Sequence, residues 1–254
     1  MTFILSASVD TLQLALLIVS ACFLPLVIWM IAAGIQVRTR FQKYSTVASE
    51  KGYTGAEAAR AILDANGMRD VQIIRCAGSL TDHYDPTTRT VALSQATYDS
   101  SSVAAIGVAA HEVGHAIQHE EDYAPVKIRT KLVPVVNFTS RLSLPLILIA
   151  MVFEFMGYFS SFSMQISTFF LGLAVVCYFF YCLFTFITLP TEYNASSRAK
   201  KQLVECGILT EAEVADASKV LSAAAKTYLV NFAFSLMQML RLLFIVLIRR
   251  NRNR

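Results

Sequence analysis

The chain has 254 residues, of which 55% are hydrophobic and only 16% are charged. Soluble domains carry about 25% charged residues, so this composition indicates that much of the chain lies in lipid. The net charge of +4 is small and shows no basic face of the kind that binds nucleic acid, so we expect a lipid bilayer and no nucleic acid among the partners. The five cysteines form no CxxC pair, and we expect neither a disulfide framework nor a thiolate metal site.

The first apolar segment runs from Leu12 to Ile35 and is long enough to span a bilayer, which takes about 20 residues. No basic residue precedes it, and its apolar run is longer than that of a signal peptide. Pro25 favours a kink within it. Arg38, Arg40 and Lys43 follow at once, so the positive-inside rule predicts that its C-terminal end lies in the cytoplasm.

The long polar-rich stretch from Tyr44 to Val133 predicts an extramembrane domain. Thr54-Gly55-Ala56-Glu57 has the spacing of a capping box and predicts the start of a helix. Asn66-Gly67 is typical of a helix end, because glycine adopts a positive φ without strain. A helix therefore opens this domain.

A small β-sheet is expected after that helix. Val71 to Cys76 has the composition of a strand. Ser79 to Tyr84 and Arg89 to Ser94 flank Asp85-Pro86-Thr87-Thr88, and Asp followed by Pro favours a type I turn. These three segments predict a strand and a β-hairpin.

His111-Glu112-Val113-Gly114-His115 is the stretch that carries chemistry. Residues four apart on a helix project from one face, so the two histidines can bind one zinc ion. Glu112 lies near enough to take a proton from a metal-bound water, whose pKa zinc lowers to about 7. Ser101 and Ser102 are available as N-caps of the helix. The alternative is an ordinary helix with two histidines.

Leu142 to Tyr158 and Phe169 to Leu189 are the second and third apolar segments. The loop expected between them, Ser160 to Ile166, has no Lys or Arg and is therefore predicted outside. A hairpin returns the chain to its starting side, so Glu192 comes back to the face that holds the histidine motif. Catalytic zinc has three protein ligands and an open position, and Glu192 is the predicted third ligand. The alternative is an interfacial carboxylate at a helix start.

The C-terminal part predicts two helices. Thr191 to Glu205 is expected to be one, and Thr210-Glu211-Ala212-Glu213 has capping-box spacing and opens the next. That helix leads into the apolar segment Tyr228 to Ile248. A fourth crossing would place the arginine-rich tail outside, so this segment is expected to be re-entrant, interfacial or packed without crossing. Arg241 either lines the site or extends to the membrane interface.

Three stretches together resemble the membrane-bound neutral zinc metallopeptidases of the YugP-like family. They are His111 to His119, Leu80 to Pro86 and Leu189 to Ser196. The resemblance extends over nearly the whole chain. It implies a zinc-dependent endopeptidase of bacterial membranes, of the gluzincin type, acting on peptide or protein substrates.

Carried over from this resemblance, His111, His115 and Glu192 would be zinc ligands and Glu112 the general base. In related gluzincins an aspartate follows the glutamate ligand one helical turn later and orients a ligand histidine. Here that position is Ser196. A ligand histidine needs such an acceptor, which Ser196, Asn194 or a backbone carbonyl would supply.

The remaining site residues have several possible roles. A developing oxyanion needs a donor besides zinc, and His83, Tyr84 and Arg198 are candidates. The edge of the hairpin is expected to bind substrate as an added strand. His119 is either a polar residue at the helix end or a fourth ligand, which would close the open position.

Two other functions are alternatives to the endopeptidase. An intramembrane site-2-type protease would take its third ligand from an aspartate in a later apolar helix, and the second and third segments contain none. A membrane adaptor with a structural zinc would usually have four protein ligands and no free carboxylate beside them, which Glu112 disfavours.

The sequence thus predicts a mostly helical α+β membrane protein, with three to four hydrophobic membrane segments and a small zincin-like domain that carries a short β-sheet. The zinc site is expected to face the cytoplasm of a bacterial cell, and the sequence carries no indication of oligomeric state. The expected parts are a transmembrane helix at 12–35, the metallopeptidase domain at 44–133, a transmembrane hairpin at 142–189, helices carrying the third ligand at 190–227, and an apolar segment at 228–248.

Overall fold

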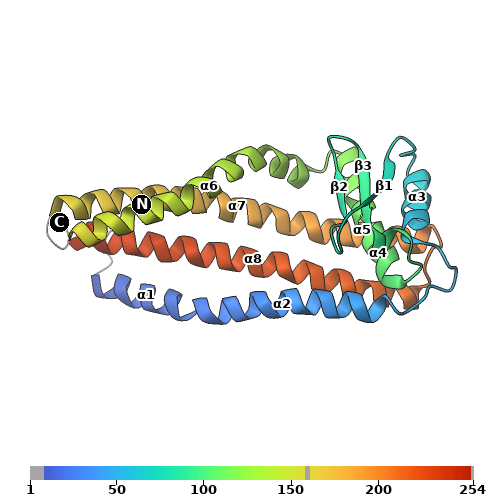
Figure 1. Ribbon diagram of the computed structural model, residues 1–254, viewed down its shortest axis with the longest axis horizontal. Helices are drawn as coiled ribbons and strands as arrows, with labels where there is room; N and C mark the ends of the chain where they lie inside the picture. The colour runs from blue at the N-terminus through green and yellow to red at the C-terminus, as the bar shows by residue number, and fades with distance from the viewer. Residues whose placement is uncertain (1–8, 158–160, 253–254) are drawn as a thin grey trace. The chain divides into compact units, whose positions relative to one another are not determined.

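The computed structural model of the chain describes residues 9–157 and 161–252. The chain divides into two compact units, each described by itself. Among the described residues, the helical unit comprises 9–30, 129–157, 161–187 and 229–252, and the α/β unit comprises 31–128 and 188–228. The elements in chain order are α1 (Val9–Ala21), α2 (Phe23–Tyr44), α3 (Gly55–Ala65), β1 (Gln72–Cys76), β2 (His83–Asp85), β3 (Thr90–Ser94), α4 (Gln95–Tyr98), α5 (Val103–Glu120), α6 (Ala124–Gly157), α7 (Ser161–Glu205) and α8 (Glu211–Arg252) (Figure 1).

The three strands form one sheet in the order β1-β3-β2. β2 and β3 are antiparallel, with Tyr84 opposite Val91, and this pairing confirms the predicted hairpin. β1 runs parallel to β3, with Ile74 opposite Ala92. All five residues of β3 are buried, as expected for a central strand covered on both faces. β2 is left at an edge of the sheet.

The core of the α/β unit lies where α3 and α5 pack against the sheet. The predicted capping box is present at the start of α3, because Thr54 accepts from the Glu57 amide and Glu57 accepts from the Thr54 amide. Gly67 has a φ of 74°, which confirms the predicted helix end. Ile62, Leu93 and Ile106 are fully buried in this core. The core therefore fixes α5 rigidly beneath the sheet.

Four helical stretches are long and apolar enough to span a membrane: Asp10–Tyr44, Ala124–Gly157, Phe162–Glu205 and Glu211–Asn251. Together with the small sheet they make the chain a mostly helical α+β membrane protein, as predicted. The first stretch is interrupted at Cys22, between α1 and α2. Pro25 explains the interruption, because its nitrogen cannot donate to the Ala21 carbonyl four residues earlier.

Two predicted helix boundaries are wrong. Residues 161–166 were expected in a loop, but α7 already begins at Ser161. Thr191 to Glu205 was expected to be a helix separate from the third apolar segment, but α7 continues through Pro190 to Glu205. Apolar helices tolerate such a proline, because neighbouring helices and local adjustments satisfy the freed backbone groups. Glu192 therefore lies on the same continuous helix as the third apolar segment.

Within the helical unit, α8 runs alongside α6 and α7 (Figure 1). The Thr185 and Ser235 hydroxyls are 2.8 Å apart, and further along α8 Arg249 donates to the Ser167 hydroxyl at 2.9 Å and pairs with Glu154. α8 is one uninterrupted helix, so the re-entrant alternative for its apolar part is wrong. Its apolar part extends along α7 from Thr185 back to Ser167.

Candidate metal centre and active site

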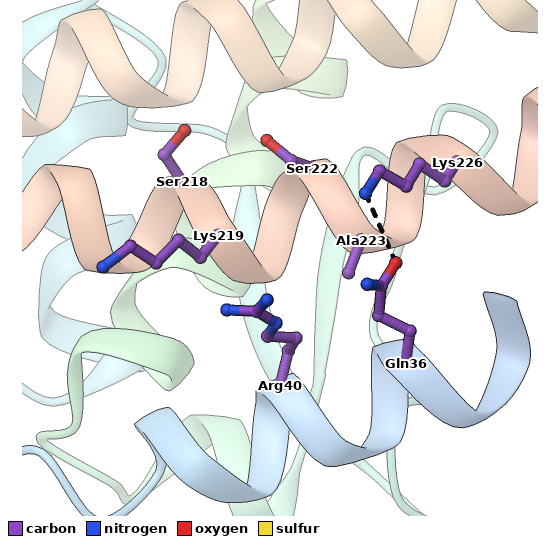
Figure 2. A pocket seen from close by; sticks show the side chains of 7 residues that line it. All are labelled: Gln36, Arg40, Ser218, Lys219, Ser222, Ala223 and Lys226. Atoms are coloured by element: carbon purple, nitrogen blue, oxygen red, sulfur yellow. Dashed lines mark hydrogen bonds between the residues drawn. The ribbon is translucent and has the colours of Figure 1, made fainter. Parts of the chain in front are cut away.

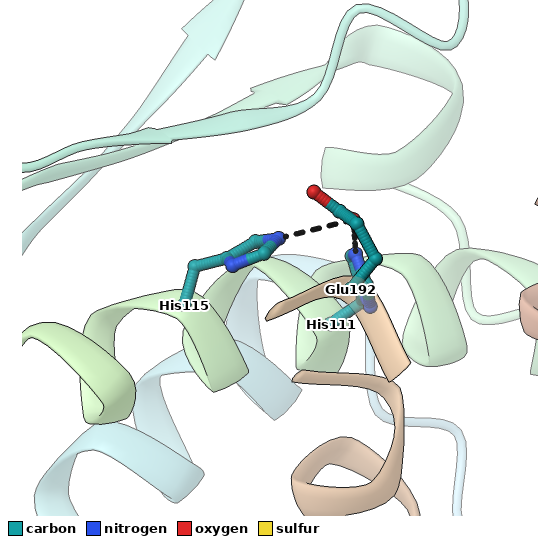
Figure 3. A group of neighbouring side chains, drawn as sticks. All are labelled: His111, His115 and Glu192. Carbon is teal, nitrogen blue, oxygen red and sulfur yellow. Dashed lines mark hydrogen bonds and ion pairs between the residues drawn. The ribbon is translucent and has the colours of Figure 1, made fainter. Parts of the chain in front are cut away.

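The histidine motif lies in the second half of α5. The helix begins as predicted, because the Ser102 hydroxyl accepts from the Ala105 amide and caps it. Most of α5 is buried. Glu112, which lies between the two histidines in the motif, is only 8% exposed. His111 and His115 are half-buried and project from one face of the helix (Figure 3).

The structure brings Glu192 of α7 to these two histidines (Figure 3). The Glu192 Oε2 atom lies 3.3 Å from His111 Nε2 and 3.5 Å from His115 Nε2. One ligand atom from each of the three residues lies within 4.8 Å of the others. Glu192 is only 2% exposed, so its carboxylate has little contact with solvent. These three residues could hold a metal ion.

The donor set fits zinc in type and in spacing. Imidazole nitrogens and a carboxylate oxygen are ordinary zinc ligands. Two ligand atoms about 2.0–2.1 Å from a tetrahedral zinc ion lie roughly 3.3–3.4 Å apart. The two separations from Glu192 are close to that value. Burial lowers the pKa of His115, but the hydrogen bond and charge of Glu192 outweigh it and raise the pKa overall. The arrangement therefore favours a cation among the three side chains.

The remaining nitrogen of each histidine has its own partner. The Ser196 hydroxyl lies 3.1 Å from His111 Nδ1, so Ser196 occupies the supporting position that the sequence suggested for it. The Gln118 Oε1 atom lies 3.0 Å from His115 Nδ1. With both Nδ1 atoms engaged, the Nε2 atoms are the ones directed at Glu192.

Gln118 is fixed by a further chain of hydrogen bonds. Its Nε2 donates to the Thr191 carbonyl at 2.8 Å and to Asn194 Oδ1 at 2.9 Å. Arg198 Nε donates to the same Asn194 oxygen at 2.7 Å, and Arg198 Nη2 lies 2.6 Å from Glu121 Oε2. The hydrogen bond from Arg198 lowers the pKa of Glu121. Asn194 and Arg198 thus connect α7 to α5 through Gln118.

Sequence reasoning missed Gln118. Asn194 was one of three candidates for the direct partner of a ligand histidine, and the structure places it one hydrogen bond further away, on Gln118. The available signal was spacing, because residues three apart on a helix are neighbours and Gln118 follows His115 by three. A buried glutamine at that position indicates a group that needs orienting.

The other predicted site residues lie on the hairpin side of α5. The Tyr84 hydroxyl is 3.0 Å from His119 Nδ1, and burial raises the pKa of Tyr84. His119 is absent from the metal-binding group found among the described residues, which favours its role as a polar residue at the helix end. His83 is exposed and its Nδ1 lies 2.8 Å from the Thr81 carbonyl.

Glu112 and His111 line a cavity of about 170 Å³ within the α/β unit. Most of its remaining wall is apolar and comes from α2, α5, α8 and the loop before β2. These residues are Val37, Leu80, Val108, Val220, Leu221, Ala224 and Tyr228, with Asp82 as the further polar member. The carboxylate of the histidine motif therefore borders a space suited to an apolar group.

The fold and the site define a membrane-bound zinc metalloprotease. The chain belongs to the family described as "Putative neutral zinc metallopeptidase", whose model matches residues 19–247. It is also 44% identical, over 221 residues, to a protein of Bacillus subtilis (strain 168) named "Putative membrane protease YugP". That match covers 87% of this chain and 93% of the relative. No solved structure matches the chain. The cofactor of this family is Zn²⁺, which agrees with the donor set of His111, His115 and Glu192.

Proposed function

We propose that this protein hydrolyses peptide bonds at the cytoplasmic face of the membrane, with His111, His115 and Glu192 as zinc ligands and Glu112 as the general base. The observation that carries the proposal is the meeting of three ligand atoms from α5 and α7. Glu112 is one residue from a histidine of that group and lines the same cavity as His111. Three protein ligands leave a fourth position open, as catalysis requires.

A bound zinc ion would polarise the scissile carbonyl and lower the pKa of a water molecule to about 7. Glu112 would take the proton from that water and pass it to the leaving amine. Because Glu112 is buried among apolar side chains, its carboxylate would be held close to the reacting atoms and away from bulk water. Ser196 and Gln118 would keep both imidazoles in the tautomer that leaves Nε2 free.

The apolar cavity supports a preference for substrates with an apolar side chain near the scissile bond. An acidic side chain would lose its hydration there without gaining a partner of opposite charge, since the charged groups of the lining, Asp82 and Glu112, are themselves acidic. The loop before β2 contributes Leu80 and Asp82 to this cavity, and β2 is an edge strand. An extended peptide that pairs with β2 would therefore pass beside Glu112.

Tyr84 and Arg198, two of the candidates for contacts with the oxyanion, are already engaged in hydrogen bonds. Arg198 acts on His115 through Asn194 and Gln118, which supports a positioning role for it. Tyr84 fixes His119 at the end of α5. His83 is exposed and is the candidate most available to a substrate.

The cytoplasmic orientation rests on charge. Arg38, Arg40 and Lys43 follow the first apolar segment, and the α/β unit contains many further basic residues. Arg249, at the far end of α8, is paired with Glu154, so its charge is compensated. Proteolysis of residues 44–133 in inverted but not in right-side-out vesicles is the expected result. Cleavage only in right-side-out vesicles would show that residues 44–133 lie on the opposite side of the membrane.

The role of Glu112 is tested by Glu112→Gln, which keeps the shape of the side chain and removes the base. We expect full zinc content and a loss of peptide hydrolysis of about 10²–10⁴-fold. Glu211→Gln is the matched control, because Glu211 is an exposed carboxylate at the start of α8. Activity of Glu112→Gln equal to that of the control would remove Glu112 from the mechanism.

A further inference from the structure

A second cavity in the α/β unit is lined by cations. It lies between α2 and α8, has a volume of about 170 Å³ and is here named the cationic cavity. Its lining consists of Gln36, Arg40, Ser218, Lys219, Ser222, Ala223 and Lys226 (Figure 2). We propose that the cationic cavity binds the phosphate group of an anionic membrane lipid.

The positive charges in this cavity are incompletely neutralised. Arg40 is half-buried and makes no hydrogen bond or ion pair with the residues that the structure describes. Its guanidinium extends from α2 toward α8, between Lys219 and Lys226 (Figure 2). Lys226 donates at 3.4 Å to the neutral Gln36 amide oxygen. Of the three cations, Lys219 has a carboxylate partner, Asp216, at 2.7 Å.

The lining has the chemistry of a phosphate site. An arginine guanidinium presents paired N–H donors that match phosphate oxygens, and a lysine ammonium adds a mobile point charge. Ser218 and Ser222 also line the cavity, with their hydroxyls directed away from Arg40 (Figure 2). No carboxylate is among the residues that line the cavity. An anion placed there would neutralise cations that otherwise repel one another.

The position of the cavity along its helices points to a lipid as the source of the phosphate. On α2 the strongly exposed apolar side chains Ile31 and Ile35 come directly before Gln36 and Arg40. On α8 the polar residues end at Lys226, and an apolar stretch begins at Tyr228. In both helices the cavity residues therefore stand where an apolar stretch meets a polar one, which is the depth of lipid headgroups. Basic pockets at that depth recognise anionic lipids.

The test titrates the full-length protein in detergent micelles with phosphatidylglycerol, phosphatidylcholine or inorganic phosphate, and follows bound ligand by native mass spectrometry. The double variant Arg40→Gln/Lys226→Gln removes the two cations without a carboxylate partner. Arg38→Gln/Arg69→Gln is the matched control, because it removes the same charge from two exposed arginines outside the cavity. We expect phosphatidylglycerol to bind best, and its affinity to fall on the order of twentyfold in the double variant alone.

Three outcomes would overturn the proposal. Equal binding of phosphatidylcholine would show that lipid charge is not recognised. Equal binding of inorganic phosphate at matched concentration would assign the cavity to a free anion rather than a lipid. An unchanged affinity in Arg40→Gln/Lys226→Gln would place the lipid elsewhere. The comparison of the three ligands uses the wild-type chain, so it stands even if the double variant folds poorly.

Discussion

Gly114 of α5 packs against the backbone of Ala195 of α7 so closely that a Cβ atom on Gly114 would lie 2.6 Å from the Ala195 carbonyl oxygen. The glycine inside the histidine motif therefore sets the distance between the helix that carries the two histidines and the helix that carries Glu192. Since Glu192 lies one turn before Ala195, this close approach is what places the carboxylate within reach of both imidazoles.

The first prediction concerns this contact. Gly114→Ala should push α7 away from α5, lower the free energy of unfolding by about 1–3 kcal/mol and reduce the zinc content. Thermal unfolding and metal analysis of the purified protein measure both effects. Gly34→Ala is the matched control, because no atom lies within 4 Å of a Cβ placed on that helical glycine. Equal thermal stability and equal zinc content in Gly114→Ala and Gly34→Ala would show that the close approach of α5 and α7 is dispensable.

Gln118 should act on zinc affinity through His115. Removing the partner of a ligand histidine typically costs 10–100-fold in metal affinity, and we expect Gln118→Ala to fall in that range. Competition with a chelator measures the affinity directly. Gln95→Ala, at an exposed glutamine of α4, is the control. Ser196→Ala removes the corresponding partner of His111 and should also weaken binding. Unchanged affinity in both Gln118→Ala and Ser196→Ala would show that these contacts do not support the ligands.

The apolar cavity beside Glu112 should determine which peptides are cleaved. Ala224→Phe would fill part of it and should lower kcat/KM for peptides with a large apolar side chain, relative to peptides with a small one, by about tenfold or more. The measurement is hydrolysis of two peptides that differ only at that residue. Ala212→Phe, at an exposed position of α8, should leave the ratio unchanged. If the ratio of the two kcat/KM values is the same in Ala224→Phe and Ala212→Phe, the cavity does not determine specificity.

The ion pair between Glu121 and Arg198 predicts a pH dependence of stability. Because Arg198 lowers the pKa of Glu121, the pair stabilises the fold above the ordinary carboxyl value of 4.5, and this contribution is lost as the pH falls through the lowered pKa. Glu121 is 55% exposed, so the effect should be small and weakened by salt. Thermal unfolding of Glu121→Gln should therefore differ from wild type near neutral pH and converge with it in acid. A difference that stays constant in acid would contradict this assignment.

Much of the site follows from local rules applied to the sequence. The spacing of His111 and His115 places them on one helical face, and a membrane hairpin returns Glu192 to the same side regardless of its orientation. The capping box at Thr54 and the hairpin around Asp85-Pro86 also depend on neighbouring residues alone, and the structure contains both. Predictions succeeded where a few adjacent residues decide the conformation.

Predictions from the sequence failed where packing against a distant segment of the chain decides the structure. Pro190 is a local signal for a helix end, yet α7 continues through it because its neighbours accommodate the freed backbone groups. The sequence assigns Gly114 no role beyond its place in the motif, because its importance depends on the backbone of Ala195, 81 residues away in the chain. Gln118 was missed for a similar reason, since its two donors are satisfied by Thr191 and Asn194 of another helix.

The zinc content of Glu192→Ala tests most directly whether α5 and α7 hold the ion together. We predict about one zinc ion per chain in the wild type and in Glu112→Gln, and a loss of most zinc together with hydrolysis in Glu192→Ala. Elemental analysis of the three purified proteins after dialysis against a weak chelator provides the comparison. Full zinc content and wild-type hydrolysis in Glu192→Ala would contradict the convergence of two imidazoles and this carboxylate on one metal.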